Sequence, residues 1–384
     1  MRLLVFTTQF PPDVGGVETM SWQLSKQFHA QGISVTVLAP ELAGAVEFDA
    51  TQDLGIKRFS LGGSDTILAK SKQKRDLVLM LRQCLDEQRP DGILCTGWDP
   101  CAYIASLAAR PRFPYFLIAH GMELMQLPLR FPARQSKAFL RRRTLKNARR
   151  IFAVSEFTRE RVVALGVHRE RVSVIPNGVE TRPTLPANGV NGAKRILMTV
   201  SRLVPRKGHD AVLRAMPRIL EEMPDVLYRI VGTGPERDRL DSLSRALKIQ
   251  SNVEFYGEVS DRKRDRLLTE CDIFLLPTRQ TPTDFEGLGI AVLEAMQNGK
   301  PVIVTRAGGV PELVDEGRTG IVIEPDSHEA LAQATLEMLK SPERARQMGQ
   351  NAKLLVEERY RWETIAGRYL SEIEASLTSV SAVA

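Results

Sequence analysis

Short apolar runs rich in β-branched residues alternate with helix-like segments along the whole of this 384-residue chain. Near-continuous hydrophobic strands between helices are typical of a parallel sheet that helices cover on both faces. The first half contains predicted strands at 3–8, 34–39, 56–61, 92–96, 115–119, 151–154 and 172–176. The second half adds 196–201, 227–232, 253–257, 273–276, 302–305 and 321–324. The sequence therefore predicts an α/β protein built on parallel sheets.

The length of the chain exceeds one ordinary hydrophobic core and predicts two domains of roughly 180 residues each. The stretch 180–194 is rich in Pro, Gly and Asn and has no periodicity, which is typical of a linker. We therefore expect Rossmann-like, doubly wound domains at 1–182 and 195–361, joined by a linker at 183–194. Domains of this kind bind ligands at the carboxyl ends of their strands, here in a cleft that both domains would face.

Composition is that of an ordinary globular protein, with 43% hydrophobic and 26% charged residues. No apolar run approaches the roughly 20 residues that span a bilayer. The N-terminus enters a strand pattern at once, without a signal-peptide layout. The cysteines lack the paired spacing of zinc or redox sites, so we expect free thiols in a reducing cytoplasm. They are Cys84, Cys95, Cys101 and Cys271.

Positive charge is concentrated in the first half of the chain. Residues 1–185 hold 26 Lys and Arg against 17 Asp and Glu, a balance of 26 − 17 = +9, whereas the rest holds 27 against 29, a balance of −2. The densest stretch, 130–150, includes Arg141, Arg142 and Arg143, and several of its cations share one helix face beside Phe and Leu residues. Such a helix favours contact with an anionic membrane or acceptor. A solvated basic helix is the alternative.

The stretch 281–296, TPTDFEGLGIAVLEAM, is the most informative motif of the sequence. It places Glu286 and Glu294 on either side of a Gly-Leu-Gly turn that follows a predicted strand and enters a helix-prone segment. A helix N-terminus binds anions, because unpaired N–H groups and the helix dipole point at the ligand. Carboxylates beside such a phosphate site are suited to accept hydrogen bonds from hydroxyl groups. Phosphate and hydroxyl groups together describe a nucleotide sugar.

Two cations follow the first strand of the second domain, in the segment VSRLVPRKGHD. Arg202 and Lys207 stand five residues apart on a predicted βα loop, where they can clamp a diphosphate. A solvated basic loop is the alternative, and we interpret the neighbouring Arg206 as a solvated cation of that kind.

Two motifs of the first domain stand at the carboxyl ends of predicted strands. Gly15 and Gly16 follow the first strand, where glycine lets backbone amides approach a phosphate or sugar closely. His120 ends the run YFLIAH at the ligand-binding edge of the sheet. An ordinary turn and a structural histidine are the alternatives.

Taken together, these residues resemble the retaining glycosyltransferases of family 4, which have the two-domain GT-B architecture, over essentially the whole chain. The specific element is the basic loop followed by a glutamate, seven residues and a second glutamate. Ser201 and Leu288 stand where many members have glycine and phenylalanine, and both suit their loops. The segment FPPDVGGVET is most similar to bacterial enzymes that glycosylate lipids and surface polysaccharides, including the phosphatidylinositol mannosyltransferases.

The resemblance implies a role for each motif. Arg202 and Lys207 would hold the donor diphosphate. Glu286 would contact the sugar, together with His120 from the first domain, and Glu294 would bind the ribose. The final helix, at about 362–384, would cross back onto the first domain. The residues implied to line the donor site, apart from the catalytic set His120, Arg202, Lys207 and Glu286, are Gly15, Gly16, Gly232, Val259, Gly287, Leu288, Gly289 and Glu294.

The expected function is transfer of a hexosyl group from GDP-mannose or a UDP-hexose to a hydroxyl of a lipid-linked or cell-surface glycan. Retention of configuration is implied by the resemblance alone. The sequence offers no second carboxylate as a covalent nucleophile, which favours front-face attack with the leaving diphosphate taking the acceptor proton. No aspartate-x-aspartate motif occurs, so Arg202 and Lys207 are expected to replace a metal. We expect neither a cofactor nor a nucleic-acid partner.

Three alternatives stay open at this point. The same chemistry can act on a small soluble acceptor. A sugar-nucleotide epimerase can share the architecture, although it needs an acid–base pair that His120 alone does not make. A nucleotide-binding regulator would bind the donor without acceptor-dependent release of nucleotide. The expected location is the cytoplasm, including the cytoplasmic face of the inner membrane.

Overall fold

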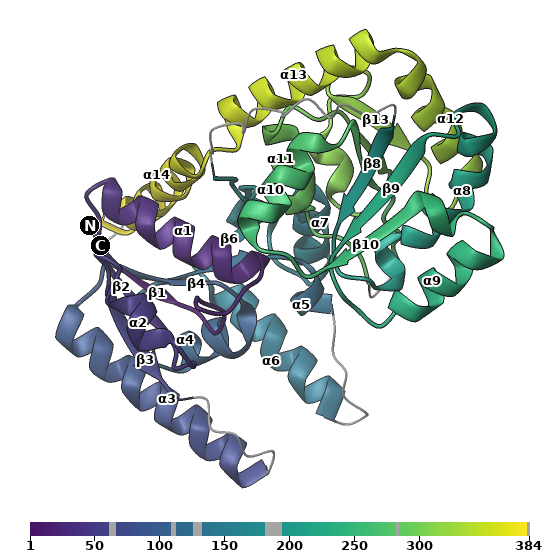
Figure 1. Ribbon diagram of the computed structural model, residues 1–384. Helices are drawn as coiled ribbons and strands as arrows, with labels where there is room; N and C mark the ends of the chain where they lie inside the picture. Colours follow the sequence, from purple (N-terminus) through teal and green to yellow (C-terminus); the bar gives the residue numbers. More distant parts are fainter. Residues whose placement is uncertain (61–66, 109–112, 126–132, 181–193, 282–283, 382–384) are drawn as a thin grey trace. The chain divides into compact units, whose positions relative to one another are not determined.

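The computed structural model describes residues 1–60, 67–108, 113–125, 133–180, 194–281 and 284–381. The chain divides into two compact units, unit 1 with Met1–Gly178 and Trp362–Ala384, and unit 2 with Val179–Arg361 (Figure 1). The predicted linker 183–194 lies, apart from Lys194, outside the described residues.

Unit 1 is built on a parallel sheet of seven strands in the order β3-β2-β1-β4-β5-β6-β7. All strands predicted from the first half are present, with ends shifted by at most two residues. The side chains of β4 and β5 are buried throughout, as expected for a sheet covered on both faces. The strands are β1 (Arg2–Phe6), β2 (Ser34–Pro40), β3 (Gly55–Phe59), β4 (Gly92–Cys95), β5 (Tyr115–Ala119), β6 (Arg150–Ala153) and β7 (Val172–Val174).

Helices cover both faces of this sheet, with α1 and α14 on one face and α3, α4 and α6 on the other (Figure 1). Ser155 begins α7 as an N-cap, because its side-chain oxygen accepts a hydrogen bond from the Thr158 N–H at 3.1 Å. The helical segments of the unit are α1 (Gly16–Ala30), α2 (Ala45–Asp49), α3 (Ile67–Gln88), η1 (Trp98–Ala102), α4 (Tyr103–Ala108), α5 (Met122–Met125), α6 (Ala133–Asn147), α7 (Glu156–Ala164), η2 (Arg169–Arg171) and α14 (Trp362–Ser381).

The last helix, α14, packs on unit 1 although unit 2 precedes it in the chain. The Tyr369 ring lies edge-on to Phe152, with ring centroids 4.8 Å apart, and to Phe28 at 6.4 Å. Arg149 adds a polar anchor, since its Nε and Nη2 donate to the carbonyl of Ser376 at 3.0 and 2.7 Å. Burial of each large aromatic ring contributes about 1.5–3 kcal/mol, so this helix is part of the core of unit 1.

Unit 2 is built on a parallel sheet of six strands in the order β10-β9-β8-β11-β12-β13. Every strand predicted from the second half is present, with ends shifted by at most one residue. The strands are β8 (Arg195–Val200), β9 (Val226–Val231), β10 (Val253–Gly257), β11 (Ile273–Leu276), β12 (Val302–Thr305) and β13 (Gly320–Ile323). The two parallel sheets confirm the predicted fold class.

In unit 2, α8, α9 and α12 cover one face of the sheet, α10 and α11 cover the other, and α13 contacts both α11 and α12 (Figure 1). Ser260 and Ser327 cap α10 and α12 through their side-chain oxygens. The helical segments are η3 (Pro205–Lys207), α8 (His209–Glu222), α9 (Arg237–Ala246), η4 (Gln250–Asn252), α10 (Asp261–Glu270), α11 (Ile290–Gln297), η5 (Val310–Leu313), α12 (His328–Lys340) and α13 (Pro342–Arg359).

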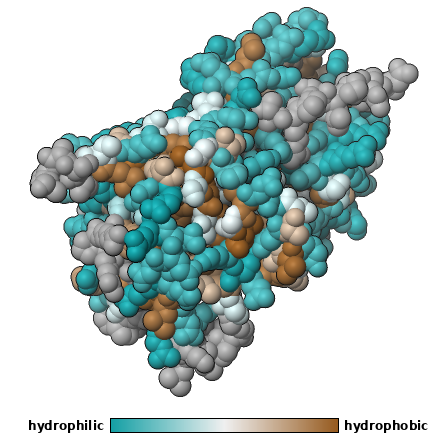
Figure 2. Space-filling model, turned by 90° about the vertical axis from the view of Figure 1, so that its left-hand side faces the viewer, coloured by the Kyte–Doolittle hydropathy of each residue, from teal (hydrophilic) through white to brown (hydrophobic). Residues whose placement is uncertain are grey.

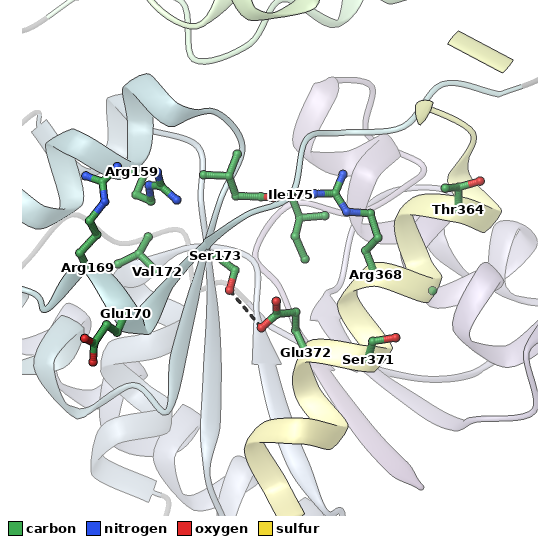
Figure 3. Close-up of a pocket in the computed structure, with 12 residues that line it drawn as sticks. Arg159, Arg169, Glu170, Val172, Ser173, Ile175, Thr364, Arg368, Ser371 and Glu372 are labelled. Carbon is green, nitrogen blue, oxygen red and sulfur yellow. Dashed lines mark hydrogen bonds between the residues drawn. The ribbon is translucent and has the colours of Figure 1, made fainter. Parts of the chain in front are cut away.

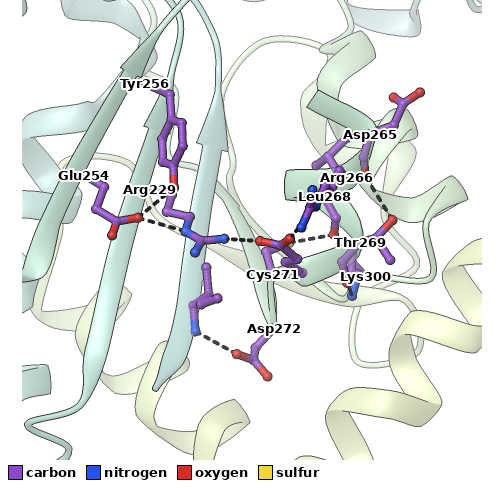
Figure 4. Close-up of polar contacts among 12 residues, drawn as sticks. Arg229, Glu254, Tyr256, Asp265, Arg266, Leu268, Thr269, Cys271, Asp272 and Lys300 are labelled. Carbon is purple, nitrogen blue, oxygen red and sulfur yellow. Dashed lines mark hydrogen bonds and ion pairs between the residues drawn. The ribbon is translucent and has the colours of Figure 1, made fainter. Parts of the chain in front are cut away.

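A guanidinium group ties the β10 edge of this sheet to α10 (Figure 4). Arg229 on β9 donates from Nε to Glu254 at 3.0 Å and from Nη1 to Glu270 at 2.8 Å. The Tyr256 hydroxyl donates to the same Glu254 carboxylate at 3.0 Å. The side chain of Arg229 is 13% exposed, so its charge is neutralised by two carboxylates in a partly desolvated position.

Polar groups dominate the surface of the molecule seen in Figure 2, and hydrophobic residues form smaller areas between them. Large apolar side chains that stand out into solvent among the described residues are Val14, Val46, Leu79, Leu107, Phe139 and Leu354. Across the described helices, none combines the length and the apolar character that a membrane crossing requires.

The loops after β8 and β11 approach one another closely at Gly208. This residue has φ +72°, and a Cβ at its position would lie 1.9 Å from the carbonyl oxygen of Pro277. Gly317 has nearly the same backbone, with φ +74°, but a Cβ there would meet no atom within 4 Å. The two positions therefore separate backbone strain from steric contact.

We predict that Gly208→Ala destabilises unit 2 far more than Gly317→Ala. Both changes cost the roughly 1–2 kcal/mol of a left-handed alanine. Gly208→Ala must also displace the backbone at Pro277, which adds at least about 2 kcal/mol. Differential scanning calorimetry of the two variants measures the difference. Equal losses would mean that the loops do not pack as described.

Candidate functional site

The candidate site of unit 2 lies where the strand order of its sheet reverses. β8 pairs with β9 on one side and with β11 on the other, and the helices that follow β8 and β11 cover opposite faces of the sheet. Open α/β sheets bind ligands at this point, outside the carboxyl ends of the strands. The loop after β8 carries Arg202 and Lys207, and the loop after β11 carries Glu286. The topology therefore brings together motifs that are about 80 positions apart in sequence.

Glu286 is the centre of a buried ion cluster. Its Oε2 atom accepts hydrogen bonds from Arg206 Nη1 and from Lys207 Nζ. Arg206 also pairs through Nε with Asp284, at 3.2 Å. The side chains of Arg206, Lys207 and Glu286 are 13%, 11% and 15% exposed. Charges with so little access to water need partners, and here each has one.

The neighbouring charges and the burial of the cluster shift the pKa values of Glu286 and Lys207. Burial raises the pKa of Glu286, but the positive charges of Lys207 and Arg206 prevail and hold that pKa below its usual value. Burial also lowers the pKa of Lys207, against the attraction of Glu286. Glu286 is therefore a carboxylate at neutral pH and acts only as a hydrogen-bond acceptor.

Arg202 and the turn before α11 complete this edge of the sheet. The side chain of Arg202 is exposed and makes no hydrogen bond or ion pair with the described residues. Gly289 precedes the first residue of α11, so only the turn 287–289 separates Glu286 from the helix N-terminus. The backbone amides at the start of α11, together with Arg202 and Lys207 of the β8 loop, give this edge the character of an anion site. The predicted turn residues are Gly287, Leu288 and Gly289.

Glu294 lies on α11 in a different charge environment. Its Oε1 is 3.3 Å from Nη2 of Arg264 on α10, and its side chain is 23% exposed. Glu286 and Glu294 therefore have different cationic partners.

Gly232 follows β9 and allows two backbone segments to pass close together. It has φ +131°, and a Cβ there would lie 2.0 Å from the carbonyl oxygen of Ser201. The requirement for glycine at this position is explained by packing against the β8 loop. Val259 follows β10 and is partly exposed. The structure does not test a donor contact for either residue.

In unit 1 the predicted residues lie after β1 and β5. A Cβ at Gly15 would lie 2.2 Å from the Glu18 carboxylate, which accepts a hydrogen bond from Gln9 at 3.1 Å. Gly16 is the first residue of α1. The Nε2 atom of His120 lies 3.1 Å from the carbonyl oxygen of Thr96, which can only accept, so Nε2 carries the proton. Nδ1 of His120 makes no hydrogen bond to the described residues.

Arg141 corrects the prediction for the basic segment. Arg142 and Arg143 are exposed on α6, but Arg141 is 8% exposed and its guanidinium donates to the carbonyl of Leu124. Burial lowers the pKa of Arg141. The helix turns this side chain into unit 1, away from the exposed face that carries Arg142 and Arg143.

A separate hollow of about 740 Å³ lies beside β7 in unit 1 (Figure 3). Its arginines already have partners in the protein, since Arg169 pairs with Glu160 and Arg368 donates to the Val174 carbonyl at 2.8 Å. None of the residues predicted to bind the donor lines it. It is not part of the candidate site.

Two family models match adjacent parts of the chain. Residues 14–182 match the model described as Glycosyltransferase Family 4, and residues 182–355 match the model described as Glycosyl transferases group 1. The chain belongs to the family 4 glycosyltransferases. This confirms the family resemblance and identifies the protein as an enzyme.

The glycosyltransferase is similar to two mannosyltransferases over nearly its full length. One is the GDP-mannose-dependent alpha-(1-6)-phosphatidylinositol monomannoside mannosyltransferase of Mycolicibacterium smegmatis, 28% identical over 95% of this chain and 96% of the relative. The other is the GDP-mannose-dependent monoacylated alpha-(1-6)-phosphatidylinositol monomannoside mannosyltransferase of Corynebacterium glutamicum, 28% identical over 97% of each chain. Among solved structures, Anabaena HepE in complex with UDP has a TM-score of 0.79 at 20% identity, covering 98% of this chain and 100% of the other. This likeness confirms the GT-B fold.

Sequence reasoning missed Arg206 and a buried relay behind the glycosyltransferase site. Thr199 Oγ1 donates to the Leu275 carbonyl at 2.8 Å, and the Tyr228 hydroxyl donates to Thr199 Oγ1 at 2.9 Å. The Tyr228 oxygen therefore accepts from His209 Nδ1 at 3.1 Å, and His209 Nε2 accepts from Ser201 Oγ at 2.9 Å. The relay fixes the side chain of Ser201, the residue that precedes Arg202. Only the position of His209 after the KG pair hinted at it.

We predict a pH dependence of stability from His209. Burial lowers the pKa of His209 to about 4 from its ordinary 6.5. The unfolded chain therefore takes up a proton below pH 6.5 that the folded chain excludes until about pH 4. The stabilisation is complete above pH 6.5 and falls by about 1.4 kcal/mol per pH unit below it.

Urea unfolding of the wild type and of His209→Gln at several pH values measures this effect. The difference between their free energies of unfolding should shrink as the pH falls from 6.5 towards 4, because all other groups titrate alike in both proteins. A difference that stays constant with pH would contradict the prediction.

Proposed function

We propose that this glycosyltransferase moves a hexosyl group, with retention, from GDP-mannose or a UDP-hexose to a hydroxyl of a lipid-linked or cell-surface glycan. The observation that carries the proposal is the pairing of Lys207 with Glu286 in front of the N-terminus of α11. A cation and helix amides suit a diphosphate, and an ionised carboxylate suits sugar hydroxyls. The names of the two mannosyltransferase relatives support a mannosyl donor and a phosphatidylinositol-type acceptor.

In the proposed reaction the bond between the sugar C1 and the diphosphate oxygen breaks while the acceptor oxygen bonds to C1 from the same face. The acceptor proton passes to the departing diphosphate. Lys207 and Arg202 stabilise the negative charge that grows on the diphosphate, as preorganised groups do in an oxyanion site. Arg202 suits this role because its exposed side chain has no partner among the described residues.

The remaining residues have proposed roles in holding the donor. Glu294 accepts hydrogen bonds from the ribose hydroxyls. Gly15, Gly16 and His120 of unit 1 contact the phosphate and sugar, with Nδ1 of His120 as the atom that has no partner among the described residues. Val259 and Gly232 lie in loops that border the base and ribose.

The cations make a metal unnecessary in this proposal. Among the described residues, no group of three or more His, Cys, Asp and Glu side chains is placed to hold a metal ion. The buried Lys207 and the exposed Arg202 supply the charge that a metal supplies elsewhere.

We predict that acceptor-dependent release of GDP or UDP continues in the presence of EDTA. Lys207→Ala should lower this turnover roughly 100-fold, because a preorganised charge is lost. Lys300→Ala is the matched control, since this lysine donates to the Thr269 carbonyl at 2.7 Å, away from the site. Loss of turnover in EDTA that magnesium restores would place the charge on a metal. Normal turnover of Lys207→Ala would remove Lys207 from the mechanism.

We further propose that unit 1 contacts anionic membranes through α6. The exposed face of this helix presents Phe139, 66% exposed, beside Arg142, Arg143 and Lys146. An aromatic ring among cations suits a lipid headgroup region, and each cation near an anionic leaflet contributes about 1 kcal/mol. The lipid acceptors named for the relatives support a peripheral enzyme of the cell envelope.

We predict that the protein co-sediments with anionic vesicles at low salt and not with neutral ones. Arg142→Glu with Arg143→Glu should abolish this binding without changing the affinity for GDP or UDP. The charge-matched control is Arg344→Glu with Arg346→Glu, two exposed arginines of unit 2. A wild-type protein that ignores anionic vesicles would favour a soluble acceptor.

A further inference from the structure

The two cations of the ion cluster compete for one oxygen of Glu286. Arg206 and Lys207 both donate to Oε2. The other oxygen, Oε1, accepts no hydrogen bond from the described residues. Oε1 is not fully buried, so it reaches solvent. Oε1 is therefore the atom that Glu286 can offer to a sugar hydroxyl.

Arg206 is fixed at three points. Besides Glu286 it pairs with Asp284 at 3.2 Å, and its carbonyl accepts the N–H of Arg279 at 2.8 Å. Arg279 is itself held by Asp210, to which its two Nη atoms donate at 2.7 and 3.2 Å. The backbone and the guanidinium of Arg206 are thus both anchored, so this residue cannot follow a ligand without breaking several bonds.

Lys207 has a simpler environment. Glu286 is the partner of its ammonium group among the described residues, and an ammonium carries three donors. The ammonium of Lys207 is a point charge on a flexible chain and changes partners easily. The planar guanidinium of Arg206 is bound to two carboxylates and does not. When a diphosphate enters the site, Lys207 is the cation that can turn to it.

Such a change of partner leaves Glu286 dependent on Arg206. The charged groups that face Glu286 are Arg206 and Lys207 from the β8 loop and Asp284 from its own loop. The segment before η5 adds only backbone, with the Gly309 N–H donating to the Glu286 carbonyl at 2.9 Å. Arg202 acts indirectly, through its repulsion of Lys207. A buried carboxylate without a counter-charge takes up a proton and then no longer accepts through both oxygens.

We propose that Arg206 is a positioning residue, which keeps Glu286 ionised and oriented towards the sugar while Lys207 moves from Glu286 to the donor diphosphate. This inference rests on the proposed function. It assigns a role to a residue that the sequence presents only as one more cation of a basic loop.

The test measures how much the sugar adds to nucleotide binding. Isothermal titration calorimetry gives the dissociation constants of GDP and GDP-mannose, and of UDP and UDP-glucose, between about pH 5.5 and 8.5. The variants are Arg206→Gln, which removes the charge, and Arg206→Lys, which keeps it without the planar fork. Arg229→Gln is the matched control, because Arg229 is equally exposed at 13% and also bridges two carboxylates through Nε and Nη1.

In the wild type and in Arg229→Gln, the nucleotide sugar should bind better than its nucleoside diphosphate by a factor that does not change with pH. In Arg206→Gln this factor should fall about tenfold at the acidic end, the value of one hydrogen bond to a charged group, and recover as the pH rises. Arg206→Lys should lie between the two. The dissociation constant of the nucleoside diphosphate alone should change by less than about threefold in every variant.

Three outcomes would overturn the inference. Arg206→Gln with the same pH-independent factor as the wild type would show that Lys207 alone keeps Glu286 ionised. Loss of nucleoside diphosphate binding in Arg206→Gln would make Arg206 a direct ligand of the diphosphate. A wild-type protein that binds neither GDP nor UDP would remove the proposed function, and the role of Arg206 with it.

Discussion

The carboxylate of Glu286 and the two cations that neutralise it lie where water has little access, and the local structure of unit 2 follows from that pairing. A charge without a partner in such a position costs several kcal/mol, so the loops after β8 and β11 must stay together. The two loops can come this close because Gly208 has no Cβ that would meet the Pro277 carbonyl. Arg279 ties the same two loops through the Arg206 carbonyl. Charge pairing and close backbone contact thus reinforce one another.

Parallel strand pairing supplies the geometry that this pairing needs. In a parallel sheet the carboxyl ends of all strands lie on the same edge, and where the strand order reverses the connections from two neighbouring strands leave towards opposite faces and open a crevice between them. In unit 2 these are the loops after β8 and β11, which carry the cations and the carboxylate. Anion-binding amides come from α11, which begins in the second loop. One fold therefore provides charge, acceptor and helix N-terminus within a short span.

The sequence predicted both sheets to within two residues, because their buried strands are short apolar runs that few other elements resemble. It could not predict which cation binds Glu286, since Arg202, Arg206 and Lys207 look alike in a basic loop. Sequence also does not show which side of a helix faces the core when both sides are basic, so it could not separate the buried Arg141 from the exposed Arg142 and Arg143. The relay through His209 depends on Tyr228 and Thr199 from separate strands, and such contacts leave no local pattern.

The position of α14 has a consequence for the chain as a gene product. Because Trp362–Ala384 belongs with Met1–Gly178, unit 2 is an insertion within the sequence of unit 1. Unit 2 is one continuous segment and can be excised by two cuts, whereas unit 1 is complete only when both of its pieces are joined. A stop codon before Trp362 would remove Tyr369 from its place against Phe28 and Phe152. Helix α14, Trp362–Ser381, therefore decides whether unit 1 can close its core.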